Sequence, residues 1–219
     1  MAILEILMRF MNGFLAVIFP SKPDIEALEN LTPGDFFAKA RKPIDNDTCG
    51  TISLFCYKDP LVRQTLWALK YGGNKKIAGL FAKLLYDRII EEISDEIMYS
   101  PSAKILIVPM PMSKERRTER GWNQSEMIAR CIAKYDRTLE FETDILEKIR
   151  HTAPQTKLSR RERLKNLRGC FRVSDPEKIN GRIVILIDDV TTTGSTMKEA
   201  NLVIAAAKPR RIICLAVAH

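Results

Sequence analysis

The hydropathy pattern alternates between short apolar runs and amphipathic segments. The most apolar run is Ile183 to Ile187, five consecutive aliphatic residues, which is typical of a parallel strand buried on both faces. The same pattern predicts further strands at 51–57, 104–108, 144–150 and 211–218, and helices at 61–69, 75–93, 124–135, 159–167 and 195–206. Strands that alternate with helices predict an α/β fold with a parallel sheet flanked by helices.

The N-terminal 48 residues have a different character. Glu5, Arg9 and Asn12 interrupt the otherwise apolar stretch within residues 1–19 and share one helical face. We therefore expect an amphipathic helix here, packed on the protein in preference to a membrane surface. These charges argue against a transmembrane span, and the segment lacks the pattern of a signal peptide. Residues 20–48 are rich in turn formers and predict a linker with a short helix near 25–30. We therefore divide the chain into an N-terminal helical extension, 1–48, and a main domain, 49–219.

The segment after the apolar run carries the most specific chemistry. Asp188 and Asp189 stand where the strand is expected to end, and a hydroxyl-rich turn, Thr191 to Thr196, leads into the next helix. Two adjacent carboxylates can accept hydrogen bonds from the two hydroxyls of a ribose. A Thr/Gly/Ser turn at a helix N-terminus presents N–H and O–H groups to a phosphate. The pattern predicts a cradle for ribose 5-phosphate at the carboxyl edge of the sheet.

Three other interpretations of this segment have to be compared with a ribose 5-phosphate cradle. Walker B strands also end in acids, but the chain has no G-x-x-x-x-G-K-S/T loop. An aspartyl-phosphate hydrolase would carry its acids as D-x-D, whereas here they are adjacent. The remaining alternative is an acidic turn followed by an ordinary helix cap, and the co-occurrence of the acid pair with the turn argues against it.

The segment resembles the phosphoribosyl-pyrophosphate (PRPP) motif of type I phosphoribosyltransferases, without a gap from Val184 to Thr196. The resemblance implies that Asp188 and Asp189 are the catalytic-site acids that hold the ribose 2′- and 3′-hydroxyls. It assigns the rest of the ribose and 5-phosphate cradle to Val190, Thr191, Thr192, Thr193, Gly194, Ser195 and Thr196.

Four further blocks resemble the ComF branch of that family, in the family's order, over residues 50–219. They are 69–73, then 108–111 with 116–117 and 120–124, then 150–152 with Gln155, Leu158 and Ser159, and finally 161–163 with Asn166 and Phe171. The resemblance implies a type I phosphoribosyltransferase-like fold with a hood over PRPP. It makes these residues candidates for the pyrophosphate and hood contacts: Lys70, Tyr71, Arg116, Arg117, Arg120, Asn123, Gln124, Arg161 and Arg163.

Each of these blocks also has a purely structural interpretation. The prolines at 109 and 111 could serve simply to make a rigid turn, without contacting a ligand. Lys70, followed by Gly72 and Gly73, also fits a helix that ends at a glycine cap and has a favourable lysine in its last turn. The basic residues between 150 and 171 could be a solvated face, and His151 is at most a further contact.

Net charge and cysteine content indicate which ligands, which compartment and which metal sites suit the protein. The formal net charge of +8 favours polyanionic ligands without choosing among them. Five scattered cysteines suit a reducing cytoplasm. ComF proteins commonly carry an N-terminal four-cysteine zinc module, whereas Cys49 and Cys56 alone cannot close a tetrahedral site, so we expect no structural zinc.

Two functions remain open. In the first, the protein transfers a 5-phosphoribosyl group from PRPP to an unidentified nitrogen acceptor and releases pyrophosphate, with Mg²⁺ bound mainly through PRPP. In the second, it binds PRPP or a nucleotide without turnover, or handles single-stranded DNA with DNA-uptake proteins in competence. An aromatic fraction of 7% gives little support for base stacking. The resemblance also admits a homodimer.

Overall fold

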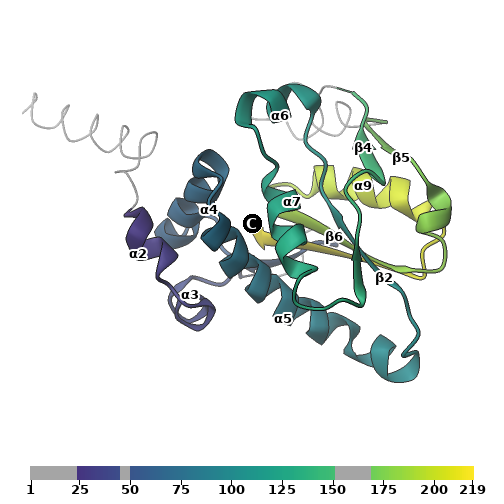
Figure 1. The fold of residues 1–219 in the computed structure, drawn as a ribbon, viewed down its shortest axis with the longest axis horizontal. Coiled ribbons are helices and arrows are strands. Elements are labelled where there is room, and N and C mark those ends of the chain that lie inside the picture. Colours follow the sequence, from purple (N-terminus) through teal and green to yellow (C-terminus); the bar gives the residue numbers. More distant parts are fainter. Residues whose placement is uncertain (1–23, 45–49, 151–168) are drawn as a thin grey trace, which may run out of the picture.

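The computed structural model describes residues 24–44, 50–150 and 169–219. In these residues, five parallel strands form the central sheet in the order β1-β7-β6-β2-β3 (Figure 1). The strands are β1 (Ile52–Phe55), β2 (Ile105–Pro109), β3 (Leu139–Phe141), β6 (Ile183–Val190) and β7 (Arg211–Ala218). The predicted apolar strand is β6, which lies between β2 and β7 and is buried on both faces from Ile183 to Ile187.

Alternate side chains of β6 face two separate apolar layers. Ile183, Ile185 and Ile187 belong to the cluster that includes α4 (Pro60–Gly72), α5 (Lys75–Tyr99) and α7 (Gln124–Ile132). Val184 and Leu186 belong to the cluster that includes α9 (Ser195–Ala205). Figure 1 shows α5 and α9 on opposite sides of the sheet. This layering is the predicted α/β arrangement, with helices on both faces of a parallel sheet.

Among the described residues, two short helices precede β1. The first, α2 (Ile25–Glu29), matches the short helix expected near 25–30. The second, α3 (Pro33–Lys39), corrects the expectation of a linker. Thr32 Oγ1 accepts the Asp35 N–H at 3.1 Å and Pro33 fills the first turn, so prolines that suggested turns here start a helix instead. The helix expected over the first nineteen residues lies outside the described residues, and the boundary at 48/49 stays a prediction.

A second, two-stranded sheet lies apart from the central one. The strand expected at 144–150 exists as β4 (Leu146–Lys148), but it pairs antiparallel with β5 (Phe171–Val173) instead of joining the parallel sheet. Leu146 and Phe171 are buried in the same cluster as α9, which fixes this small sheet over one face of the domain. The helix expected at 159–167 lies outside the described residues.

The basic block after β2 forms a helix that the sequence pattern did not predict. This helix, α6 (Lys114–Arg120), begins after Ser113 and ends at Gly121, which has φ of 80°. A further short element, η2 (Pro176–Lys178), is a single 3₁₀ turn. The predicted helix 75–93 extends to Tyr99, and the one expected to reach 135 ends at Ile132. In the part of the chain that the structure describes, no helix is long and apolar enough to cross a membrane.

Candidate functional site

The acidic pair belongs to β6 itself and does not follow it. Asp188 is paired in register with Ala216, and the strand continues to Val190, which corrects the expectation that it ends at Ile187. Asp188 Oδ1 accepts hydrogen bonds from Ser125 Oγ at 3.0 Å and from the Asp189 N–H at 2.9 Å. Asp189 Oδ1 accepts the Val190 N–H at 2.9 Å. Oδ2 takes no part in these bonds on either carboxylate.

The environment of Asp188 disfavours its negative charge. Burial raises the pKa of this carboxyl well above its ordinary value, and the neighbouring Asp189 carboxylate raises it further. The hydrogen bonds from Ser125 and from the Asp189 N–H act in the opposite direction but are outweighed. A ligand that brings hydroxyl donors or positive charge to this position would therefore be bound favourably.

The turn after β6 prepares the start of α9. Thr191 N–H donates to the Ala218 carbonyl at 2.9 Å, which ties the turn to β7. The Thr193 and Ser195 hydroxyls are hydrogen-bonded at 2.7 Å. Gly194, at φ of 67°, is the N-cap residue of α9 and offers no side chain to cap it. In contrast, the Asp59, Asn74 and Asn123 side chains cap α4, α5 and α7. The α9 N-terminus is therefore suited to an anion.

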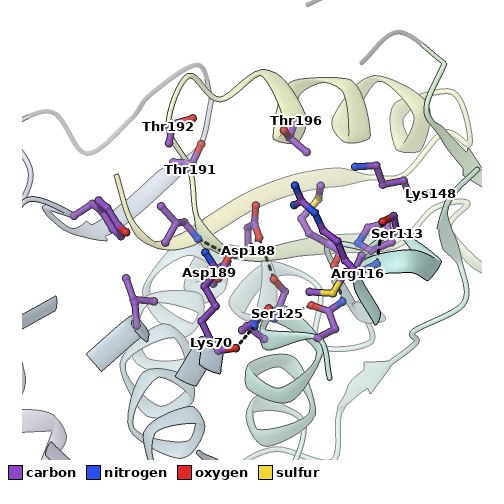
Figure 2. A pocket seen from close by; sticks show the side chains of 18 of the residues that line it. Lys70, Ser113, Arg116, Ser125, Lys148, Asp188, Asp189, Thr191, Thr192 and Thr196 are labelled. Atoms are coloured by element: carbon purple, nitrogen blue, oxygen red, sulfur yellow. Dashed lines mark hydrogen bonds between the residues drawn. The ribbon is translucent and has the colours of Figure 1, made fainter. Parts of the chain in front are cut away.

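These features open into one cavity of about 540 Å³ at the carboxyl ends of β1, β2 and β6 (Figure 2). Its volume lies within the range of about 300–1,000 Å³ that is typical of small-molecule sites. The residues that line it are Tyr57, Leu66, Trp67, Lys70, Met110, Pro111, Met112, Ser113, Arg116, Arg120, Asn123, Gln124, Ser125, Lys148 and the run from Asp188 to Thr196. The whole predicted ribose and 5-phosphate segment therefore faces a single cavity.

Among the residues that the structure describes, four basic side chains line the same cavity. Lys70, Arg116 and Arg120 are among the predicted pyrophosphate contacts. Lys148, which the sequence analysis did not single out, approaches from β4. A signal for it existed in the predicted strand, because Lys148 lies two residues after Leu146 and alternation places both on the buried face. Burial lowers the pKa of Lys148 below that of an ordinary lysine.

Three consecutive residues at the start of α7 connect the walls of the cavity. Asn123 Nδ2 donates to the Met110 carbonyl at 2.9 Å, and Gln124 Nε2 donates to the Lys70 carbonyl at 3.1 Å. Ser125 Oγ donates to Asp188, 63 positions further along the chain. Asn123 and Gln124, predicted as phosphate contacts, thus already use their side-chain N–H groups to join α7 to the β2 edge and to α4.

The other predicted contacts lie elsewhere. Tyr71 is 57% exposed and its ring packs against Trp67 with 5.1 Å between centroids, outside the cavity lining. Arg117 forms an ion pair with Glu126 at 3.0 Å and does not line the cavity either. Arg161 and Arg163, together with His151, lie outside the described residues.

Comparison with known proteins shows which proteins the chain is similar to. Residues 127–219, which include Lys148, β6 and α9, match the phosphoribosyl transferase domain. Competence protein ComFC of Bacillus subtilis (strain 168) is 31% identical over 145 residues, which cover 66% of this chain and 53% of that protein. The chain is therefore similar to a ComF protein over part of its length and carries a match to the phosphoribosyl transferase domain. DNA utilization protein YhgH of Escherichia coli (strain K12) is also 31% identical, over 140 residues that cover 64% of this chain and 57% of that protein.

The chain spans little more than half the length of these curated relatives. The predicted fold class, a type I phosphoribosyltransferase-like parallel sheet flanked by helices, is confirmed. A solved hypoxanthine phosphoribosyl transferase of Trypanosoma cruzi superposes with a TM-score of 0.41 at 12% identity, over 65% of this chain and 64% of that one.

Proposed function

We propose that this protein binds PRPP in the cavity at the carboxyl edge of its sheet. The observation that carries the proposal is that the acid pair of β6 and the N-terminus of α9, which lacks a side-chain cap, open into the same cavity. The carboxylates of Asp188 and Asp189 would accept the ribose hydroxyls. The N–H and O–H groups of the 191–196 turn would hold the 5-phosphate. The basic side chains of the lining would face the pyrophosphate.

The bound PRPP would then react with a nitrogen acceptor. The bond between the anomeric carbon and the pyrophosphate oxygen breaks, and the leaving group keeps the electron pair. The acceptor nitrogen forms the new bond to that carbon and loses its proton to solvent. Positive charge develops on the ribose in the transition state, and the adjacent carboxylates of β6 stabilise it. The basic side chains stabilise the negative charge that accumulates on pyrophosphate.

The donor set of the cavity fits a magnesium ion that arrives with its substrate. Among the described residues no three His, Cys, Asp or Glu side chains form a metal-binding group. Two carboxylates beside a polyphosphate ligand match the way Mg²⁺ is usually held, mainly through substrate oxygens. When bound, the ion would neutralise charge on the pyrophosphate. We expect the protein to bind PRPP without a structural zinc ion. We expect the reaction to take place in the cytoplasm, because scattered cysteines suit a reducing compartment.

A second candidate function is suggested by the names of the relatives. One is called a DNA utilization protein and the other a competence protein. In that case the same cavity would bind PRPP or a nucleotide without turnover, as part of a protein that handles single-stranded DNA during uptake. The net charge of +8 is compatible with a polyanionic partner.

The release of pyrophosphate distinguishes the two functions. The purified protein would be incubated with PRPP, Mg²⁺ and a panel of purine and pyrimidine bases, and pyrophosphate measured by a coupled enzymatic assay. Transfer predicts release that depends on one of the bases and is lost in the Asp188→Asn/Asp189→Asn double variant. A protein that binds PRPP but releases no pyrophosphate with any base would favour the second candidate.

A further inference from the structure

A second cavity, of about 490 Å³, lies between α3, α5 and the edge strand β1. Its volume is within the range of about 300–1,000 Å³ that is typical of ligand sites. Among the residues that the structure describes, it shares no lining residue with the cavity proposed for PRPP, so it is a separate site. We call it the β1 groove. Its apolar wall is formed by Pro33, Phe37, Ile52, Leu54 and Leu84.

Within the described part of the chain, the backbone of β1 is open on the side of this groove. β7 is the only described strand that pairs with β1. The Phe55 carbonyl accepts the His219 N–H at 3.0 Å, so the backbone groups of Phe55 point toward β7. Because backbone groups alternate along a strand, those of Ile52 and Leu54 point to the other edge, into the groove. Such an edge can pair with one more extended chain.

The open edge is short and is closed at one end. The Cys56 N–H, which points to the same edge as that of Leu54, donates to the Arg41 carbonyl at 2.8 Å. The chain at Arg41 therefore occupies the edge beyond Leu54. A strand added to the groove meets the next residue, Lys42, at this end. A peptide that ends there fits the groove better than one that continues.

Lys42 brings an incompletely solvated cation to the closed end. Its ammonium group donates to the Phe37 carbonyl. It also lies 3.2 Å and 4.4 Å from the ring centroids of Phe37 and Phe55. Burial lowers the pKa of Lys42, because the rings replace part of the water around the charge. An anion at this end would stabilise the charged form.

The carboxylates of the groove do not supply that anion. Asp87 forms an ion pair with Lys83, and Glu91 forms one with Arg88 at 3.0 Å. In the described ranges, burial is the cause of the Lys42 pKa shift and no acidic side chain contributes to it. The charge of Lys42 is therefore left for an anionic group that enters the groove from outside.

Ser53 adds a hydroxyl group without a partner to the same cavity. The residue is 2% exposed and lines the groove, and its Oγ is buried and makes no hydrogen bond in the described structure. A buried hydroxyl of this kind is stabilised by any ligand that accepts its hydrogen. Ser53 and Phe55 share one face of β1, with Cα atoms about 7 Å apart. The hydroxyl thus neighbours the ring that carries the Lys42 ammonium.

We propose that the β1 groove binds the C-terminal end of an extended peptide from a partner protein. The peptide backbone would pair with Ile52 and Leu54, as in the addition of a strand to a sheet edge. Its terminal carboxylate would accept hydrogen bonds from Lys42 and Ser53. An apolar last side chain would pack on the apolar wall. A terminal carboxylate meets both requirements of the closed end, because the added chain must stop there and Lys42 lacks an anion.

Calorimetric titration of the full chain with a peptide pair tests the groove. The probe is acetyl-Ser-Val-Thr-Val-Leu with a free carboxylate, and its C-terminal amide is the matched control. We expect the amide to bind at least about tenfold more weakly than the acid, as the loss of a charge-assisted contact implies. Lys42→Met should weaken binding of the acid by a similar factor. Lys39→Met should not, because Lys39 is exposed at the end of α3 and does not line the groove.

A second variant covers the case in which Lys42→Met does not fold. Ser53→Ala removes a hydroxyl that has no partner in the free protein, so it should melt no lower than the wild type and still bind the acid less tightly. A hydroxyl with a purely structural role would change the melting temperature and leave the affinity as it is. Equal affinity of wild type and Ser53→Ala would contradict the assignment.

Hydrogen exchange measured by NMR shows whether the edge is the surface that binds. The Leu54 amide should exchange rapidly in the free protein and slowly with the acid peptide. Slow exchange in the free protein would mean that the chain itself fills the groove, and slowing that depends on protein concentration would indicate a second copy. Either result would overturn the proposal, as would equal binding of acid and amide or no binding of the acid by the wild type. PRPP binding is measured separately and enters none of these outcomes.

Discussion

Replacement of Asn123 tests whether the start of α7 is an architectural support of the site. The Asn123 side chain is 6% exposed and makes two hydrogen bonds with different partners. Its Oδ1 accepts the Ser125 N–H at 3.1 Å and caps α7, while its Nδ2 donates to the Met110 carbonyl at 2.9 Å. Loss of an N-cap side chain costs about 1 kcal/mol, and a buried carbonyl left without its donor costs about 1–3 kcal/mol.

Two substitutions at this position separate these contributions. Asn123→Ala removes both bonds and should lower the free energy of unfolding by roughly 2–4 kcal/mol. Asn123→Ser keeps an oxygen that can cap α7 and should lose only the roughly 1–3 kcal/mol that belongs to the Met110 carbonyl. For a domain of this size, about 2–4 °C of melting temperature is lost per kcal/mol, so Asn123→Ala should melt about 4–16 °C below the wild type.

Thermal melts followed by circular dichroism, with urea titrations for the free energies, would measure these differences. Asp24→Ala is the matched control, because it removes an exposed cap of α2 with a single bond of 3.1 Å and should cost only about 1 kcal/mol. If Asn123 only contacted the ligand, its replacement would lower the affinity for PRPP and leave the melting temperature unchanged. An Asn123→Ala protein that melts with the wild type but has lost affinity for PRPP would refute the architectural role.

Two further predictions concern Asp188. Asp188→Asn should raise the melting temperature at neutral pH, because a carboxyl whose folded-state pKa is raised stabilises the fold below its ordinary pKa and loses that stability as pH rises through the raised value. The gain should vanish below about pH 4, and equal melting temperatures at neutral pH would contradict the argument. Ser125→Ala removes a hydrogen bond that lowers the Asp188 pKa, so PRPP binding should fail at a higher pH than in the wild type as acid is added. Ser125→Thr should restore the wild-type profile of affinity against pH, and an unshifted profile in Ser125→Ala would exclude this role.

The part of the site that its own residue pattern predicted is contiguous in the sequence, whereas Lys70, Arg116 and Arg120 were expected from the family resemblance. The strand, the acid pair and the turn into α9 occupy residues 183–196, so their order already specifies that they meet at one edge of a parallel sheet. Ser125 and Lys148 are far from this segment in sequence. They reach Asp188 and the cavity through the packing of α7 and of the β4–β5 sheet, and local alternation indicates only that Lys148 shares the buried face of Leu146.

The same distinction explains the errors in the fold. β3 and β5 contain three residues each, too few to show an alternating pattern. β4 was found, but its partner is decided by contacts with α9 and not by its own residues. α3 was mistaken for a linker because Pro33 marks both a turn and the first turn of a helix. β6 continues through Asp188 because pairing with β7 offsets the low strand preference of two acids.

The central claim is that the acid pair of β6 and the turn before α9 bind PRPP. Its most direct test is a calorimetric titration of the wild type and of Asp189→Asn with PRPP in the presence of Mg²⁺. Asp189 is the better choice for this measurement, because substitution of Asp188 is also expected to change stability. The account predicts saturable binding by the wild type and its loss in a variant that melts as the wild type does. Absence of binding by the folded wild type, or equal affinity in Asp189→Asn, would contradict it.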